Sequence, residues 1–111
     1  MTAIDLSEHA TDLLETARAA HSGRAAHLLV GGPQSTMTQT IIALREGAVL
    51  HEHNNPGEAT VYVLDGRVRL STGGETAEAG RGALLNIAPE PHSLEAVGDS
   101  VVLLTSVKLP G

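Results

Sequence analysis

Three of the six histidines have a spacing that suits a metal or ligand site. His51 and His53 lie two residues apart in a β-type run, and His92 follows a later run. Because side chains two residues apart on a strand project from the same face, the pair predicts two imidazoles on one side of a sheet. The chain has no cysteine, so any transition metal must be held by histidine and carboxylate. The spacing alone also fits two simpler interpretations. His51 and His53 could be a polar pair that lines an empty or water-filled barrel, and His92 could be an ordinary loop histidine. These interpretations stay open beside the metal site.

Gln39 and Asn86 are two further polar candidates for the same interior. Gln39 shares the alternation of Met37 and Ile41, which predicts either an inward amide or a partly exposed one. Asn86 interrupts the apolar run 83–87. The remaining three histidines are expected on the helix or on an edge strand. No residue is assigned as catalytic.

The composition restricts the partners that we expect. Thirteen acidic and seven basic residues give a formal charge of −6, and Tyr62 is the only aromatic residue. A negative surface repels phosphate backbones and one tyrosine offers almost no stacking platform, so nucleic acid is not expected. Neither a long apolar run nor a basic or apolar leader occurs, which predicts a soluble, cytoplasmic protein without membrane contact.

One amphipathic helix is predicted at about residues 6–21. Apolar residues recur there at intervals of three and four, the spacing of one helical face. Asp5, followed three residues later by Glu8, is typical of a helix N-terminus, and Gly23 lies where a helix stop is expected. The polar face of this helix is expected to be solvated.

Turn residues divide the rest of the chain into β-type runs, at 25–30, 37–44, 49–53, 60–64, 68–70, 83–87, 93–97 and 101–107. Short runs at even spacing predict a closed or sandwiched all-β architecture with an aliphatic core. Asp65-Gly66 between two alternating runs predicts a tight hairpin. No repeat or linker divides the chain, so we expect a single domain over residues 1–111 with its barrel at about 25–107.

The residues around the histidines resemble the two motifs of the cupin superfamily. The first motif is matched by Gly47, His51, His53, Glu58 and Gly66, and the second by Gly82, Pro89 and His92. The resemblance implies an all-β fold with one N-terminal α-helix, the cupin-type double-stranded β-helix or jelly-roll barrel. It also implies that His51, His53, Glu58 and His92 hold a divalent transition metal, which would be iron, manganese, nickel, copper or zinc.

Glu58 departs from the motif by one residue. Counted back from Gly66, the carboxylate position of the motif falls on Ala59. A slip of one residue reverses the face of a strand side chain, so Glu58 is expected to point outward unless a bulge after Pro56-Gly57 restores the register.

The function expected from this resemblance is a metal-binding cupin that takes a small organic molecule into an aliphatic barrel pocket. If the protein is an enzyme, oxygenase, isomerase or lyase chemistry would suit such a site. The alternative is a non-enzymatic ligand-binding or sensor module, because the sequence identifies no acid or base beside the metal. Small cupins commonly pair through edge strands, so a homodimer is the expected assembly.

Overall fold

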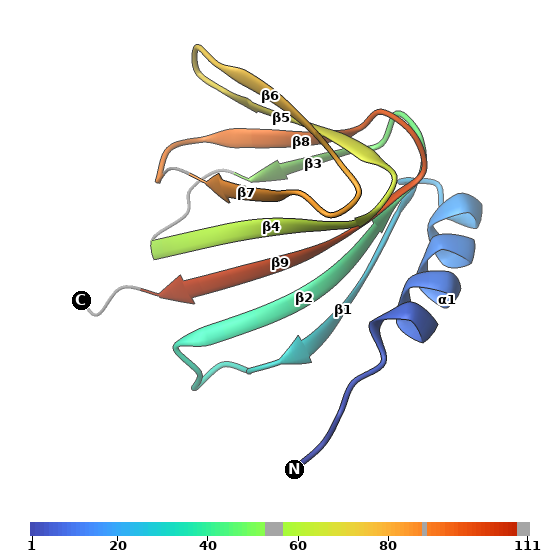
Figure 1. Ribbon diagram of the computed structural model, residues 1–111, viewed down its shortest axis with the longest axis vertical. Coiled ribbons are helices and arrows are strands. Elements are labelled where there is room, and N and C mark those ends of the chain that lie inside the picture. Colours follow the sequence, from blue (N-terminus) through green and yellow to red (C-terminus); the bar gives the residue numbers. More distant parts are fainter. Residues whose placement is uncertain (53–56, 88, 109–111) are drawn as a thin grey trace.

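The structure is a computed structural model that describes residues 1–52, 57–87 and 89–108, and of Glu52 only the backbone (Figure 1). Its elements are α1 (Leu6–Ala19), β1 (Arg24–Val30), β2 (Met37–Leu44), β3 (Val49–Glu52), β4 (Gly57–Asp65), β5 (Arg67–Thr72), β6 (Thr76–Gly80), β7 (Leu84–Ile87), β8 (His92–Ala96) and β9 (Ser100–Lys108). The prediction of an all-β fold with one N-terminal helix is confirmed. The sequence pattern did not predict β6, because its sequence Thr-Ala-Glu-Ala-Gly lacks the large apolar residues that mark a strand.

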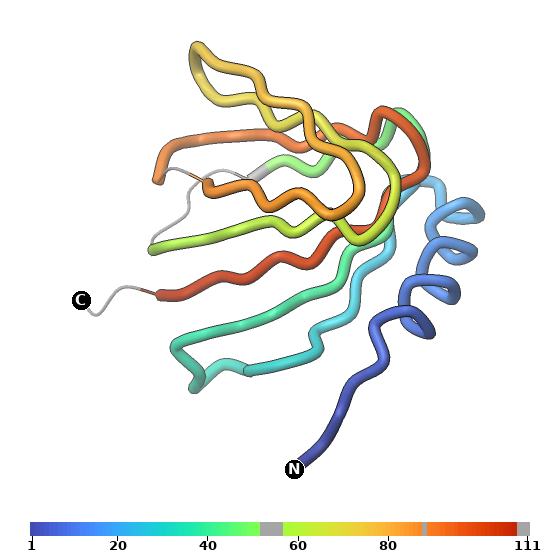
Figure 2. Tube along the Cα trace, viewed as in Figure 1, coloured from blue at the N-terminus to red at the C-terminus, as the bar shows by residue number. Residues whose placement is uncertain are grey.

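The strands form two antiparallel sheets. Sheet A has the order β1-β2-β9-β4-β7, and sheet B has the order β3-β8-β5-β6. Strands far apart in the sequence, such as β2 and β9, therefore lie side by side (Figure 2). One aliphatic cluster fills the space between the sheets, and a second lies between sheet A and α1. This is the expected jelly-roll barrel, with a helix on its outer face.

Alternation along β4 shows how the sequence builds the barrel wall. Ala59, Val61 and Val63 are buried in the cluster between the sheets, whereas Glu58 and Tyr62 are exposed on the outer face. Successive strand side chains point to opposite faces, so one strand supplies both the core and the surface. Tyr62 faces outward because Val61 and Val63 on either side of it fill the interior.

Gly66 turns the chain from sheet A into sheet B. β4 ends at Asp65 in one sheet, β5 begins at Arg67 in the other, and no ladder joins the two strands. The tight hairpin predicted here is therefore wrong, because a local turn signal does not say which strands will pair. Gly66 has a φ of +83°, and a Cβ there would meet the Asp99 carbonyl oxygen and the Ser100 side chain.

Helix α1 begins and ends close to its predicted bounds. The Asp5 carboxylate accepts hydrogen bonds from the N–H groups of Ser7 at 2.9 Å and Glu8 at 3.3 Å, which caps the first turn. The helix ends at Ala19, since Ala20 has extended backbone angles. The helix that the structure describes is not long and apolar enough to cross a membrane.

Two side chains fasten α1 to the end of the barrel. The Arg45 guanidinium donates to the carbonyl oxygens of Arg18 and Ala20, at 3.0 and 3.1 Å, at the negative end of the helix dipole. The Asp99 carboxylate accepts from the Glu46 N–H and from the Arg18 guanidinium, each at 2.8 Å. These hydrogen bonds join the helix to the β2–β3 turn and to the β8–β9 turn.

We expect this anchor to weaken in acid. The Glu46 N–H and then the Arg18 guanidinium hold the pKa of the Asp99 carboxyl below its usual value. A carboxyl with a depressed pKa contributes stability above the ordinary aspartate pKa of about 3.9, and this contribution is lost as the pH falls through the lower, folded-state value. Asp99→Ala should cost about 1 kcal/mol at pH 7, because the side chain is partly exposed.

Urea denaturation of wild type and Asp99→Ala at pH 7 and at pH 3 measures this contribution. The difference between the two proteins should shrink at pH 3. A difference that stays constant with pH would show that the Asp99 charge does not anchor the helix.

Candidate functional site

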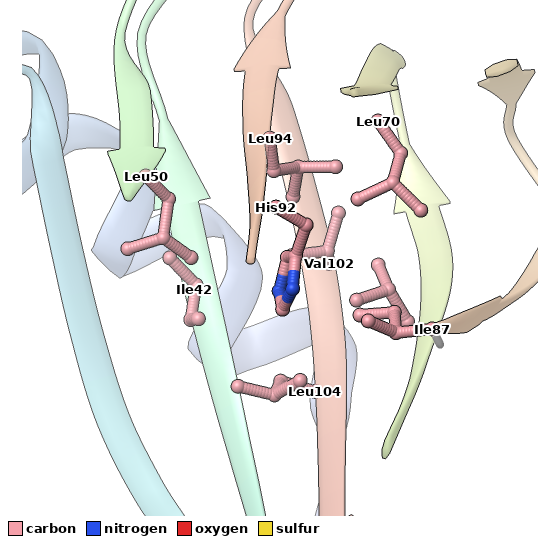
Figure 3. A pocket seen from close by; sticks show the side chains of 9 residues that line it. Ile42, Leu50, Leu70, Ile87, His92, Leu94, Val102 and Leu104 are labelled. Carbon is pink, nitrogen blue, oxygen red and sulfur yellow. The ribbon is translucent and has the colours of Figure 1, made fainter. Parts of the chain in front are cut away.

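Side chains from both sheets line a narrow cavity inside the barrel (Figure 3). They are Ile42, Leu50, Val61, Leu70, Ile87, His92, Leu94, Val102 and Leu104. Among these residues only His92 is polar. The cavity offers about 10 Å³ to the centre of a water molecule, which is room for roughly one water.

His92 is the first residue of β8, and its imidazole points into this cavity (Figure 3). The residue is only 9% exposed. Its Nδ1 lies 3.1 Å from the carbonyl oxygen of Glu90. Because a carbonyl oxygen only accepts, Nδ1 carries a proton in this hydrogen bond. In the neutral ring, Nε2 is then an acceptor with no partner among the described residues.

The local sequence explains why the Glu90 carbonyl is available to His92. Glu90 lies between Pro89 and Pro91, and a proline restricts both its own backbone and that of the residue before it. The segment bends before β8 begins, so the carbonyl turns toward the ring two residues further on. The proline of the second motif thus helps to orient the histidine.

The structure does not bring His51 to His92. His51 pairs with Ser93 on the neighbouring strand, and Leu50 pairs with Leu94. Both leucines line the cavity, so His51 lies on the opposite face of β3, where it is exposed. His53, the other member of the predicted pair, lies outside the described residues.

Glu58 lies on the outer face, as the one-residue slip predicts. It is exposed on β4, while its neighbour Ala59 is buried at 7% exposure. A bulge in the pairing of β4 with β9 occurs between Val63 and Asp65, which is too far along the strand to turn Glu58 inward. Ala59 therefore occupies the interior position at which the motif has its carboxylate.

The described residues do not by themselves form a transition-metal site. No group of three or more histidine, aspartate and glutamate side chains in the described part of the chain is placed to hold one ion. Such a site needs three or four converging nitrogen or oxygen ligands. Among the side chains that the structure describes, only that of His92 offers a ligand atom to the cavity.

Gln39 and Asn86 do not line the barrel cavity. The Gln39 amide donates to the Thr105 hydroxyl at 3.2 Å on the outer face of sheet A. Asn86 is exposed beside Thr60. Sequence reasoning missed Leu50 as a lining residue, although its apolar character next to His51 indicates which face of β3 points inward.

Fold and interior together define a small jelly-roll barrel with an aliphatic cavity. A family model described as a cupin domain matches residues 40–108, so the chain belongs to the cupin family. No curated protein matches the chain at a significant level of sequence similarity.

Solved structures with the same fold include proteins of different kinds. A conserved protein of unknown function from Streptococcus pyogenes is 26% identical with a TM-score of 0.73, and the match covers 83% of this chain and 80% of that one. An RmlC-like cupin from Desulfovibrio desulfuricans is 28% identical with a TM-score of 0.66, over 76% and 81% of the two chains. Salicylate 1,2-dioxygenase from Pseudoaminobacter salicylatoxidans is 22% identical with a TM-score of 0.72, over 92% of this chain and 31% of that one, a likeness of fold alone.

Proposed function

We propose that this cupin binds a small organic molecule in its barrel and that Nε2 of His92 accepts a hydrogen bond from it. The observation that carries the proposal is the oriented imidazole of His92, whose neighbours among the described lining residues are all aliphatic. Small-molecule sites are mostly apolar and contain a few well-placed polar groups. A buried acceptor without a partner costs free energy, which a ligand donor would recover.

A ligand larger than water requires the cavity to widen. Leu50 and Leu104 are only partly buried, in contrast to the fully packed residues of the same cluster. A change of rotamer at these two leucines would open space beside His92 without moving a strand. The ligand's own apolar surface would then replace the lost contacts.

The test uses 4-ethylphenol, whose hydroxyl donates and whose ring is apolar. We expect it to shift the methyl resonances of Leu50 and Leu104 in NMR spectra of the wild-type protein. His92→Leu removes the acceptor at nearly constant volume and should weaken binding about tenfold, the effect of one buried hydrogen bond. Exposed His21 supplies the matched control His21→Leu. Equal affinity in wild type and His92→Leu, or no binding to either, would overturn the proposal.

The second candidate is the metal-dependent cupin, and it too has one observation in its favour. A histidine that ligates a metal through one ring nitrogen usually donates its other N–H to a carbonyl or carboxylate, as Nδ1 of His92 does. On this proposal His51, His53 and Glu58 complete the site, which requires His51 and Glu58 to turn inward from their outer faces. A bound metal would supply Lewis-acid or oxygen chemistry, and oxygenase, isomerase or lyase activity would follow.

Metal content separates the two candidates. Untagged protein incubated with iron(II), manganese, nickel, copper or zinc and then desalted should retain well under one equivalent if the ligand-binding proposal holds. Near-stoichiometric metal that is lost in His92→Ala and in the double variant His51→Ala, His53→Ala would favour the metal-dependent cupin instead.

The homodimer also belongs to this proposal. Tyr62 and Leu84 are directly paired on neighbouring strands of sheet A, and both are exposed, at 39% and 64%. Adjacent exposed apolar side chains are typical of interaction surfaces. β7, which carries Leu84, is an edge strand, so a second copy would cover both features.

A further inference from the structure

A second pocket lies beside the barrel cavity, at the seam between the two sheets. β7 is the edge of sheet A, β6 is the edge of sheet B, and no ladder between described strands joins them. The pocket here measures about 170 Å³, and we call it the seam pocket. Its lining residues are Leu70, Thr72, Glu75, Thr76, Ala77, Leu85, Asn86 and Glu90.

Two residues connect the seam pocket with the buried imidazole. Leu70 lines both the seam pocket and the barrel cavity, so its side chain lies between the two spaces. Figure 3 shows Leu70 on the same side of the cavity as Ile87. Glu90 lines the seam pocket and accepts the Nδ1 hydrogen bond of His92 through its carbonyl oxygen. The group that orients the imidazole therefore belongs to the wall of the neighbouring pocket.

The charges of the seam pocket have one sign. Glu75 and Glu90 are its only charged lining residues, both are exposed, and neither forms an ion pair within the described part of the chain. Arg67 and Arg69 on β5 are engaged elsewhere, in ion pairs on the outer face of sheet B. The turn that carries Glu75 is fixed, because the Thr72 N–H donates to the Glu75 carbonyl at 2.9 Å.

We infer that the seam pocket is the entrance to the barrel and that it selects a ligand with a cationic end. The inference rests on the proposed function and names the chemical class of its ligand. An apolar body carrying a hydrogen-bond donor passes Leu70 to reach Nε2 of His92, while an ammonium group stays at Glu75 and Glu90. A carboxylate in the same place would be repelled by both glutamates, since like charges this close to each other are unfavourable.

Three probes of similar size share one phenol and carry a different charge at the other end. Tyramine is a cation, tyrosol is neutral, and 4-hydroxyphenylacetate is an anion. By NMR titration in 50 mM salt we expect tyramine to bind about fivefold more tightly than tyrosol, and tyrosol to bind more tightly than 4-hydroxyphenylacetate. Salt at 0.5 M should compress these ratios, because it screens exposed charges.

The double variant Glu75→Gln, Glu90→Gln should bring the three affinities to within about twofold of one another. It keeps the backbone carbonyl of Glu90 and so leaves the His92 hydrogen bond in place. Glu15→Gln on the exposed face of α1 is the matched control, and it should keep the wild-type order.

The possible outcomes distinguish this inference from the function on which it rests. Three results would contradict the claim that the seam pocket is an entrance selecting cationic ligands: equal binding of the three probes, tightest binding of the anion, or a preference that persists in the double variant. None of them would contradict phenol binding at His92. If none of the probes binds and 4-ethylphenol also fails, the proposed function is contradicted, and the inference falls with it.

Discussion

Gly66→Ala should lower the free energy of unfolding by about 3 kcal/mol or more, a large part of the total for a domain of this size. A φ of +83° costs a non-glycine residue roughly 1 kcal/mol. In addition, the new Cβ would lie 2.8 Å from the Cα of Ser100 and would overlap the Asp99 carbonyl oxygen. These are backbone atoms at the start of β9, so relief of the clash would disturb the ladders that β9 forms.

Two other glycines supply matched controls for urea denaturation followed by far-ultraviolet circular dichroism. Gly47 has a φ of +84° and open space where a Cβ would lie, so Gly47→Ala should cost only the conformational strain, about 1 kcal/mol. Gly74 has open space and is not among the glycines with a positive φ, so Gly74→Ala should change stability by less than about 0.5 kcal/mol. A loss of unfolding free energy at Gly66 no larger than that at Gly47 would show that the turn between β4 and β5 does not require a residue without a Cβ.

Leu44→Ala should cost about 3 kcal/mol. Leu44 is 0% exposed in the cluster between the two sheets. Truncation loses the transfer free energy of the removed carbons and leaves a cavity that a closely packed β-barrel cannot fill by collapse. The same denaturation experiment measures the loss.

Leu84→Ala is the matched control, and it tests whether the loss of stability at Leu44 comes from the burial of that side chain. Leu84 is 64% exposed on the edge strand β7, so the same substitution should change the stability of the monomer by less than about 0.5 kcal/mol. The measurement is made at low protein concentration, where association contributes least. Equal losses of unfolding free energy at Leu44 and Leu84 would contradict the assignment of Leu44 to the barrel interior and Leu84 to the surface.

Sequence reasoning predicted the fold where the signals are periodic. The helix at α1 follows from the spacing of its apolar residues, and the structure confirms it. The pairing partners of β4 and β5 could not be read in the same way, because a turn such as Asp65-Gly66 constrains the local backbone and not the choice of sheet. β6 could not be predicted from the sequence pattern, because a short edge strand buries little side-chain surface and needs few apolar residues.

The candidate site was predicted only in part. His92 faces the interior, and its orientation depends on the Glu90 carbonyl, a backbone contact that residue types do not reveal. The motif places His51 inside the barrel, but Leu50 and His51 are adjacent on β3 and cannot both point inward. In the structure Leu50 lines the cavity and His51 faces outward. The outward position of Glu58 was expected from its distance to Gly66, because register along a continuous strand can be counted.

The most direct test of the proposed site is the protonation state of the His92 ring. A long-range ¹H–¹⁵N spectrum of uniformly labelled protein at pH 7.5 should show His92 as the Nδ1–H tautomer, with Nε2 unprotonated, and 4-ethylphenol should shift the Nε2 resonance as it donates to that nitrogen. A ring protonated at Nε2, or an Nε2 resonance that does not respond to the phenol, would contradict the claim that His92 is the acceptor of a ligand in the barrel.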